Sequence, residues 1–133
     1  MVNPNFQPLD LQLIKMRKKV DAGAQFFQTQ AVYDDRSVDE FIAKAEAFGR
    51  PIQLGVVVLK SPQMGAYMNR NVSGISVPQA WIEEIGAAAK ADRKKKAAEM
   101  TGRFIKKHKS KFQGVHIMPL GWTDIVPDIL AHA

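Results

Sequence analysis

The run from Ile52 to Leu59 constrains the fold of this chain more than any other stretch, because it is almost wholly apolar. A strand that is apolar at consecutive positions is buried on both faces, as in a parallel sheet flanked by helices. Parallel strands are joined by crossovers of about a dozen or more residues, which are usually helical. The run therefore predicts an α/β fold with parallel strands.

Helical and strand patterns alternate on both sides of this run. Residues 9–22 carry apolar side chains at spacings of four, three and four positions, which draw one stripe on a helix. Gly23 then stands where a positive φ commonly ends a helix. A first strand is expected at about residues 25–32. The spacing of Ser37 and Glu40 is that of a capping box at the start of the next helix.

The second half of the chain continues the alternation. Ser61 followed by Pro62 has the form of a helix N-cap and a first helical residue. After it we expect a short strand, a helix following Pro78, a basic helix, another strand, and a last helix capped by Thr123. The two strands cover residues 74–77 and 114–118, and the basic helix covers about residues 91–109.

These patterns predict four β/α units with parallel strands, which is half of a TIM-type (β/α)8 barrel, in a single domain over residues 1–133. A complete barrel usually needs roughly 250 residues. A half-barrel leaves two strand edges and an apolar inner face uncovered. The chain is therefore expected to need a second half, a partner copy of itself, or a rearrangement into an open sheet.

The net charge of +6 is concentrated in one helical segment. Between Lys90 and Lys111 there are ten basic and two acidic residues, whereas the rest of the chain has nine basic and eleven acidic residues. A phosphate-binding face would need these charges on one continuous side, with aromatic or groove-reading groups. Three consecutive lysines instead point around the helix. A solvated outer helix is the favoured interpretation, and nucleic-acid binding is the alternative.

Several classes of protein and site are excluded by what the sequence lacks. Cysteine is absent, so there are no disulfides and no thiolate metal sites. No run approaches the ~18 consecutive apolar residues of a membrane span, and the N-terminus lacks the pattern of a signal peptide. A cytoplasmic protein is the expectation. His108, His116 and His132 lack metal-ligand spacing, so no metal site is predicted, and His116 is expected to be a hydrogen-bonded core residue.

Three uncharged polar residues, Gln28, Thr29 and Gln30, interrupt the apolar first strand. Buried polar groups need hydrogen-bond partners. Those partners come either from the core or from a ligand. For Gln30 the spacing alone fits a core glutamine bonded to neighbouring backbone as well as it fits a ligand contact.

Four short motifs occur in order along the chain. They are Lys19-Val-Asp-Ala-Gly-Ala with Thr29-Gln30 and Tyr33-Asp34, Leu54-Gly-Val-Val-Val-Leu-Lys60, Gly74-Ile-Ser-Val-Pro78, and Gly114-Val-His-Ile-Met-Pro-Leu-Gly-Trp122. Together they resemble the second half of the methylenetetrahydrofolate reductase barrel, in its bacterial and archaeal form. Each motif is weak alone, but four in register over nearly the whole chain make a specific signal.

The resemblance implies a flavoprotein in which FAD accepts hydride from NAD(P)H and reduces 5,10-methylenetetrahydrofolate to 5-methyltetrahydrofolate. It implies a folate contact for Gln30, whose amide donates and accepts at once and so matches a pterin edge. Met64 and Trp122 fall at two further substrate-contacting positions, which the family fills with glutamine and arginine. Lys19 and Gln28 fall at cofactor-binding positions, with Lys19 near the flavin phosphates.

The resemblance also implies that parts of the family's active site lie outside these 133 residues. The family's general-acid glutamate and most of its flavin contacts lie in the first four β/α units. No catalytic residue is therefore expected here, and reductase activity is expected only when the missing half completes the barrel. An acidic flavin-contacting position falls on Gln12, beside Asp10. The alternative is a non-catalytic half-barrel that binds or assembles with one-carbon or corrinoid methyl-transfer proteins.

Overall fold

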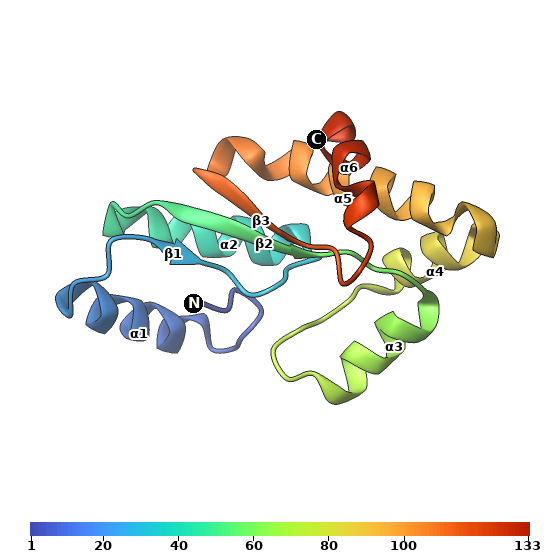
Figure 1. The fold of residues 1–133 in the computed structure, drawn as a ribbon. Coiled ribbons are helices and arrows are strands. Elements are labelled where there is room, and N and C mark those ends of the chain that lie inside the picture. Colours follow the sequence, from blue (N-terminus) through green and yellow to red (C-terminus); the bar gives the residue numbers. More distant parts are fainter.

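A three-stranded parallel sheet and six α-helices make up residues 1–133 in the computed structural model (Figure 1). The strands are β1 (Phe27–Gln28), β2 (Ile52–Val57) and β3 (Gly114–Met118). The helices are α1 (Leu9–Asp21), α2 (Asp35–Ala45), α3 (Pro62–Asn71), α4 (Gln79–Ala87), α5 (Arg93–His108) and α6 (Val126–His132). None of these helices has both the length and the apolar character that crossing a membrane requires.

β2 is the central strand, and it pairs in parallel with β1 on one side and with β3 on the other. Phe27 lies beside Ile52, and Gln53 lies beside Gly114. Every residue of β2 except Gln53 is buried. The apolar run thus forms a strand that is covered on both faces, and the prediction of an α/β fold with parallel strands is confirmed.

The expected strand at residues 74–77 is not formed, and β3 pairs directly with β2 instead. Side chains bind the backbone groups that a sheet would pair. The Asn69 amide binds the N–H and the carbonyl of Val77 at 2.7 and 3.0 Å, and Asn3 donates to the carbonyl of Gly74 at 2.9 Å. The prediction of a strand here is therefore wrong. The four-stranded half-barrel is not confirmed, because the sheet is open and has three strands.

The first strand is shorter than the expected residues 25–32. Only Phe27 and Gln28 form the ladder with β2, and Thr29 pairs in parallel with Val2 on the opposite side. The Val2 N–H donates to Gln28 at 3.0 Å, and the Gln30 N–H donates to the Val2 carbonyl at 2.8 Å. The N-terminal residues therefore extend the sheet beyond β1.

Helix ends follow the expected caps with two corrections. Gly23 has a φ of 106° just after α1, and the Ser61 hydroxyl accepts an amide N–H at the start of α3. The cap of α2 is Asp34, whose carboxylate accepts from the Ser37 N–H at 3.0 Å, so the capping box at Ser37 is wrong. Thr123 caps no helix by its side chain and begins a short 3-10 turn ahead of α6.

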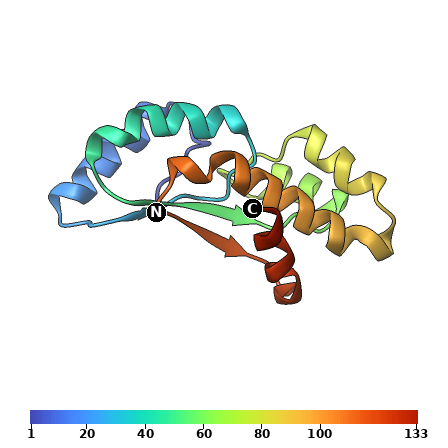
Figure 2. The same ribbon diagram turned by 90° about the horizontal axis from the view of Figure 1, so that it is seen from above.

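The core lies between the sheet and the helices that cover it. Figure 2 shows α5 crossing over the sheet, with α3 and α4 beyond the carboxyl ends of the strands. Phe41 of α2, Leu54 of β2, Met100 of α5 and Ile129 of α6 are fully buried in one cluster. This packed core holds the sheet and the covering helices together, and so fixes the position of the carboxyl ends of the strands.

Candidate functional site

The carboxyl ends of the three strands bring polar residues to one edge of the sheet. Gln30 lies just after β1, Lys60 just after β2, and residues 119–122 just after β3. Because the strands are parallel, these positions share one edge, which is where open α/β sheets bind ligands. We call this group, Gln30, Lys60 and residues 119–122, the carboxyl edge.

Lys60 connects the end of β2 to the end of β3. Its Nζ donates to the carbonyl oxygen of Leu120 at 3.0 Å and lies 5.0 Å from the ring centroid of Trp122. Its backbone N–H donates to Met64 Sδ at 3.4 Å. Two of the three predicted substrate-binding residues thus contact Lys60 at different ends, Met64 at its backbone and Trp122 at its ammonium group.

A second cation lies near the same ring. Lys94 Nζ is 5.7 Å from the Trp122 centroid and donates to the Asp124 carboxylate at 2.9 Å. This hydrogen bond is the main cause that lowers the pKa of Asp124. Leu120 has a φ of 51°, a strained value for a residue with a side chain, and such strain clusters at functional sites. The carboxyl edge thus combines two ammonium groups, an indole ring and a strained loop.

The polar triplet divides between the core and the carboxyl edge. Thr29 is fully buried, and its Oγ1 accepts the Gly55 N–H at 2.8 Å. Gln30 is half-buried, and its Oε1 accepts the N–H of Ala31 at 3.1 Å, while its amide nitrogen donates to no group of the chain. Gln28 is also half-buried. Thr29 is therefore the core member, whereas Gln30 bonds the neighbouring backbone with its oxygen and has amide donors without a partner in the chain.

Lys19 contacts the N-terminal segment and not the strand ends. It is exposed near the end of α1, and its Nζ donates to the carbonyl of Met1 at 2.6 Å. Burial, followed by the charge of Lys19, lowers the pKa of the N-terminal amine. Met64 and Trp122 both contact Lys60, whereas Lys19 belongs to a separate group.

The residues of this chain do not by themselves form a flavin site. Five cavities have volumes between about 300 and 470 Å³, and none is lined by Lys19, Gln28 or Gln30. Gln12, at the position where the resemblance expects an acid, is buried and accepts the Asn3 N–H at 3.3 Å. One exposed ammonium group and one half-buried amide do not enclose a flavin.

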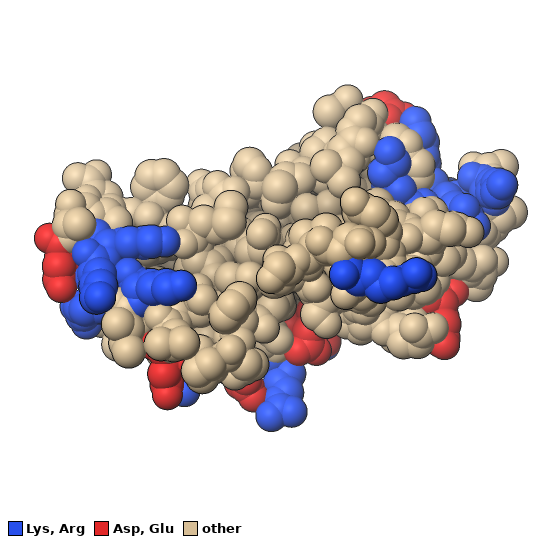
Figure 3. All heavy atoms as spheres, turned by 90° about the horizontal axis from the view of Figure 1, so that it is seen from below, with Lys and Arg blue, Asp and Glu red and all other residues tan.

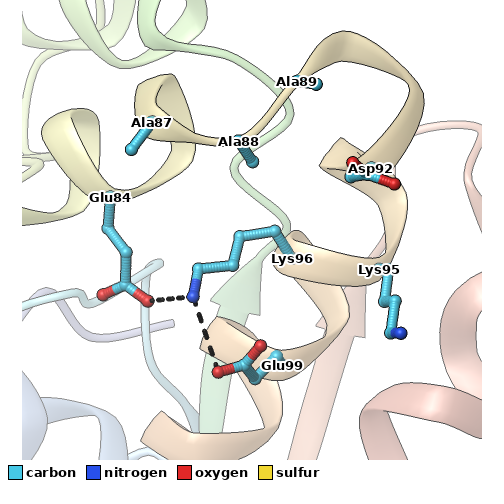
Figure 4. A pocket seen from close by; sticks show the side chains of 8 residues that line it. All are labelled: Glu84, Ala87, Ala88, Ala89, Asp92, Lys95, Lys96 and Glu99. Carbon is cyan, nitrogen blue, oxygen red and sulfur yellow. Dashed lines mark ion pairs between the residues drawn. The ribbon is translucent and has the colours of Figure 1, made fainter.

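One cavity, of about 410 Å³, lies at the junction of α4 and α5 (Figure 4). Lys96 extends between Glu84 and Glu99, with its Nζ at 3.2 and 3.5 Å from their carboxylates. Burial would raise the pKa of Glu84, but hydrogen bonds from Arg103 and Lys96 outweigh it and lower that pKa. The charges at the centre of this cavity neutralise one another, which makes it a poor candidate for a charged ligand.

Many basic side chains of α5 and the turn after it pair with acids of neighbouring elements. The pairs are Lys94–Asp124, Lys96–Glu84, Arg103–Glu84, Lys107–Asp35 and Lys111–Asp39. On the face drawn in Figure 3, basic groups stand in separate clusters with acidic groups between them. Phosphate binding needs a continuous basic face. This pairing therefore argues against the nucleic-acid alternative.

The buried histidine is His108, at 0% exposure, and not His116. His108 Nε2 lies 2.6 Å from Asp35 Oδ1, and its Nδ1 lies 3.2 Å from Lys111 Nζ. An ammonium group only donates, so Nδ1 accepts and the ring proton lies on Nε2, directed at Asp35. His116 is exposed, so its prediction as a core residue is wrong. His116 lies in β3, an edge strand whose residues are all half-buried or exposed.

Acid should destabilise the chain through carboxylates whose pKa is lowered by basic partners. These are Asp35, Asp39, Glu84 and Asp124. Burial would raise the pKa of Asp35, but hydrogen bonds from Lys107 and His108 lower it. A lowered folded-state pKa contributes stability above the unfolded-state value of about 4, and that contribution is lost as pH falls through the folded-state pKa.

We therefore expect the urea midpoint to be steady at neutral pH and to fall below about pH 4. Asp35→Asn should have a lower midpoint at neutral pH and a smaller fall in acid, because it removes one of the four groups. Unfolding followed by circular dichroism at several pH values measures both. An unchanged midpoint down to about pH 2 would contradict this account of the ion pairs.

Lys60 is the carboxyl-edge residue to which sequence reasoning gave no role. It ends the almost wholly apolar run from Ile52 to Leu59, and a charged residue in that position is a usable signal. Its contacts with Leu120 and Trp122 join residues that lie about sixty positions apart in the sequence. Spacing within the sequence could not reveal that contact.

Comparison with known proteins identifies relatives. The family model described as methylenetetrahydrofolate reductase matches residues 1–133. No curated protein matches the chain significantly. Among 40 matching chains of solved structure, one is described as an uncharacterized protein from Clostridium thermocellum that binds two copies of 5-methyl-5,6,7,8-tetrahydrofolic acid.

The likeness to that solved structure concerns the fold alone, because the identity is 15% and the TM-score is 0.50. The match covers 91% of this chain and 46% of that one, so this chain spans less than half the length of the other protein. A parallel sheet flanked by helices is consistent with part of a TIM-like fold. The family model, in contrast, matches the full length, and this chain belongs to the methylenetetrahydrofolate reductase family.

Proposed function

We propose that this chain forms one wall of a folate site in a protein that reduces 5,10-methylenetetrahydrofolate to 5-methyltetrahydrofolate. The observation that carries the proposal is the meeting of Lys60 with Leu120 and Trp122 at the carboxyl edge, beside Gln30 with its unbonded amide donors. Family membership and the folate bound by the similar solved protein support the choice of ligand.

The chemistry of a folate suits the groups at this edge. Its pterin has a donor and acceptor edge that an amide matches without adding charge, and Gln30 has unpaired amide donors. Its aromatic ring can lie against Trp122, and its glutamate carboxylates can pair with Lys60 or Lys94. The family has an arginine at the position of Trp122, and here the positive charge would come from Lys60 and Lys94 beside the indole.

Reduction requires groups that this chain does not hold. We propose that further β/α units, on another segment or another protein, supply the general acid and the enclosure for FAD, with NAD(P)H as the hydride source. Lys19 and Gln28 would then contact the flavin only from one side. The chain's own residues bind and orient the folate, and the hydride step belongs to the completed assembly.

Affinity for 5-methyltetrahydrofolate, measured by calorimetry on the full chain and on matched variants, tests the proposal. Lys60→Met and Gln30→Ala should each weaken binding about tenfold, because a hydrogen bond to a charged or buried group contributes on the order of 1.5 kcal/mol. Lys95→Met is the control, since Lys95 is exposed and has no carboxylate partner. Equal affinities for the Lys60 and Lys95 variants would contradict the proposed site.

A second candidate is a folate-binding or assembly module without reductase activity, working with a one-carbon or corrinoid methyl-transfer protein. The observation in its favour is that none of the five cavities is lined by the cofactor-position residues. Folate binding without flavin absorbance, and without NAD(P)H oxidation in the presence of the complementing half, would support this candidate over the reductase.

A further inference from the structure

A cavity of about 330 Å³ lies at the amino ends of β2 and β3, at the opposite end of the sheet from the carboxyl edge. It is lined by the connection between α2 and β2 and by the connection between α5 and β3. All four elements belong to this chain, so the cavity does not depend on a further β/α unit. Its volume is at the lower end of the range for small-molecule sites.

Gln113 lines this cavity with an amide whose orientation is fixed. Its Oε1 accepts the Ile52 N–H at 2.8 Å, and its own backbone N–H donates to the Ile52 carbonyl at 3.1 Å. These two hydrogen bonds tie the two connections together and set the amide oxygen against the backbone of Ile52. The amide nitrogen therefore keeps both of its N–H donors free, because it bonds no group of the chain.

Two cationic side chains line the same cavity, and each has donors that are not used within the chain. Arg50 is exposed and pairs with no carboxylate, in contrast to the many basic residues of α5 that pair with acids. Lys111 Nζ contacts the Asp39 carboxylate and lies 3.2 Å from His108 Nδ1. An ammonium group has three N–H donors, so one remains for a ligand. The cavity thus has an unpaired guanidinium and an ammonium group held in place by two partners.

The remaining polar side chains of the cavity are Ser110 and Glu46. Ser110 is exposed, and its hydroxyl can donate to a ligand. Glu46 is the one acidic residue of the lining, and it forms no ion pair within the chain. Four donor side chains and one acceptor carboxylate therefore line one space. A ligand that matches them has an anionic end and an end that donates hydrogen bonds.

We propose that this cavity binds a small phosphorylated molecule that carries hydroxyl groups. The phosphate accepts hydrogen bonds from the four donor side chains, and Glu46 accepts from a hydroxyl of the ligand. Arginine suits this role because its planar fork binds phosphate through two N–H groups at once. A single phosphate needs only this local set of donors, and not the continuous basic face that nucleic-acid binding requires.

This inference does not rest on the proposed folate site, because the two sites lie at opposite ends of the strands. Binding of 5-methyltetrahydrofolate should therefore be unchanged when Arg50 is replaced by methionine. Binding of a phosphorylated molecule should likewise be unchanged by Lys60→Met. The failure of one site in these experiments leaves the result for the other site readable.

Nuclear magnetic resonance titration of the 15N-labelled full chain with glycerol 3-phosphate tests the site. We expect the amide signals of residues 49–52 and 110–113 to shift together and to saturate. Inorganic phosphate should shift the same signals with lower affinity, and glycerol should shift none of them. The absence of shifts in these residues at millimolar glycerol 3-phosphate, or an equal affinity for inorganic phosphate, would overturn the proposal.

Substitutions in the lining separate a specific site from general attraction to a basic chain. Arg50→Met should weaken glycerol 3-phosphate binding about tenfold. Gln113→Glu keeps an oxygen for the Ile52 N–H but replaces the amide donors by a negative charge, so it should abolish binding in a folded chain. Lys106→Met is the control, because Lys106 is exposed on α5 outside the cavity and has no carboxylate partner.

Circular dichroism confirms that each variant is folded. Equal affinities for the Arg50 and Lys106 variants would show attraction to net charge alone and would overturn the proposal. Glu46→Gln tests the hydroxyl end of the ligand, because it removes a negative charge near the phosphate and leaves a weaker acceptor for the hydroxyl. It should therefore reduce the preference for glycerol 3-phosphate over inorganic phosphate. An unchanged preference would overturn the role of Glu46.

Discussion

Replacing Gly55 by alanine should lower the free energy of unfolding by about 3 kcal/mol, the upper end of the usual cost of overpacking. A Cβ at Gly55 would lie 2.3 Å from the carbonyl oxygen of Thr29. That oxygen belongs to the backbone of the neighbouring chain segment, so it cannot rotate away as a side chain would. Thr29 is also held to Gly55 by the hydrogen bond from the Gly55 N–H to Oγ1.

Gly114→Ala is the matched control for this substitution. Gly114 lies in β3, beside Gln53, and a Cβ there would meet no atom closer than 3.6 Å. The alanine variant should therefore have nearly the stability of the parent chain. Urea unfolding of the two variants gives the comparison. Similar losses for both would mean that β1 and β2 do not approach as closely as described.

Removing the buried imidazole of His108 should have the next largest effect. We expect His108→Ala to lose about 2 to 3 kcal/mol of unfolding free energy, from a cavity beside Phe104 and from the lost hydrogen bond to Asp35. The ring lies 4.8 Å from that of Phe104 and links α5 to the first residue of α2. Its loss should loosen the packing between these two helices.

The control for His108 is His132→Ala. His132 is exposed in the last turn of α6, and alanine keeps its Cβ. Surface changes of this kind usually alter stability by less than about 0.5 kcal/mol. Thermal unfolding at neutral pH measures both variants. If both variants lose equally little stability, the network of Asp35, His108 and Lys111 does not contribute to the stability of the fold.

The sequence predicts the fold class because local signals and burial agree in the central strand. The apolar residues of the run 52–57 lie on both faces of a strand, so both faces must be buried. Glycine and proline at helix ends are equally informative, because backbone geometry restricts where they can stand. The strand at 74–77 was a wrong prediction because β-propensity ignores competing side chains. Asn69 and Asn3, from distant segments, bind the backbone that a sheet would have used.

The candidate site could be predicted only in part. The spacing of Gln30 fits a backbone-bonded glutamine and a ligand contact equally well, and the structure shows its oxygen bonded to the Ala31 N–H and its amide nitrogen unbonded, so its binding role stays a prediction. The meeting of Lys60 with Trp122 depends on β3 lying directly beside β2, which sequence spacing did not indicate. The prediction for His116 was wrong because the apolar character of residues 114–118 suggested a buried strand, whereas every residue of this edge strand is half-buried or exposed.

We propose that the carboxyl edge of this chain binds a folate. The most direct measurement is a nuclear magnetic resonance titration of the 15N-labelled chain with 5-methyltetrahydrofolate, after backbone assignment. We expect the amide signals of Gln30, Lys60 and Leu120, and the indole signal of Trp122, to shift together and to saturate with a single affinity. Shifts confined to α5 and its basic residues, or no shifts at millimolar ligand, would contradict it.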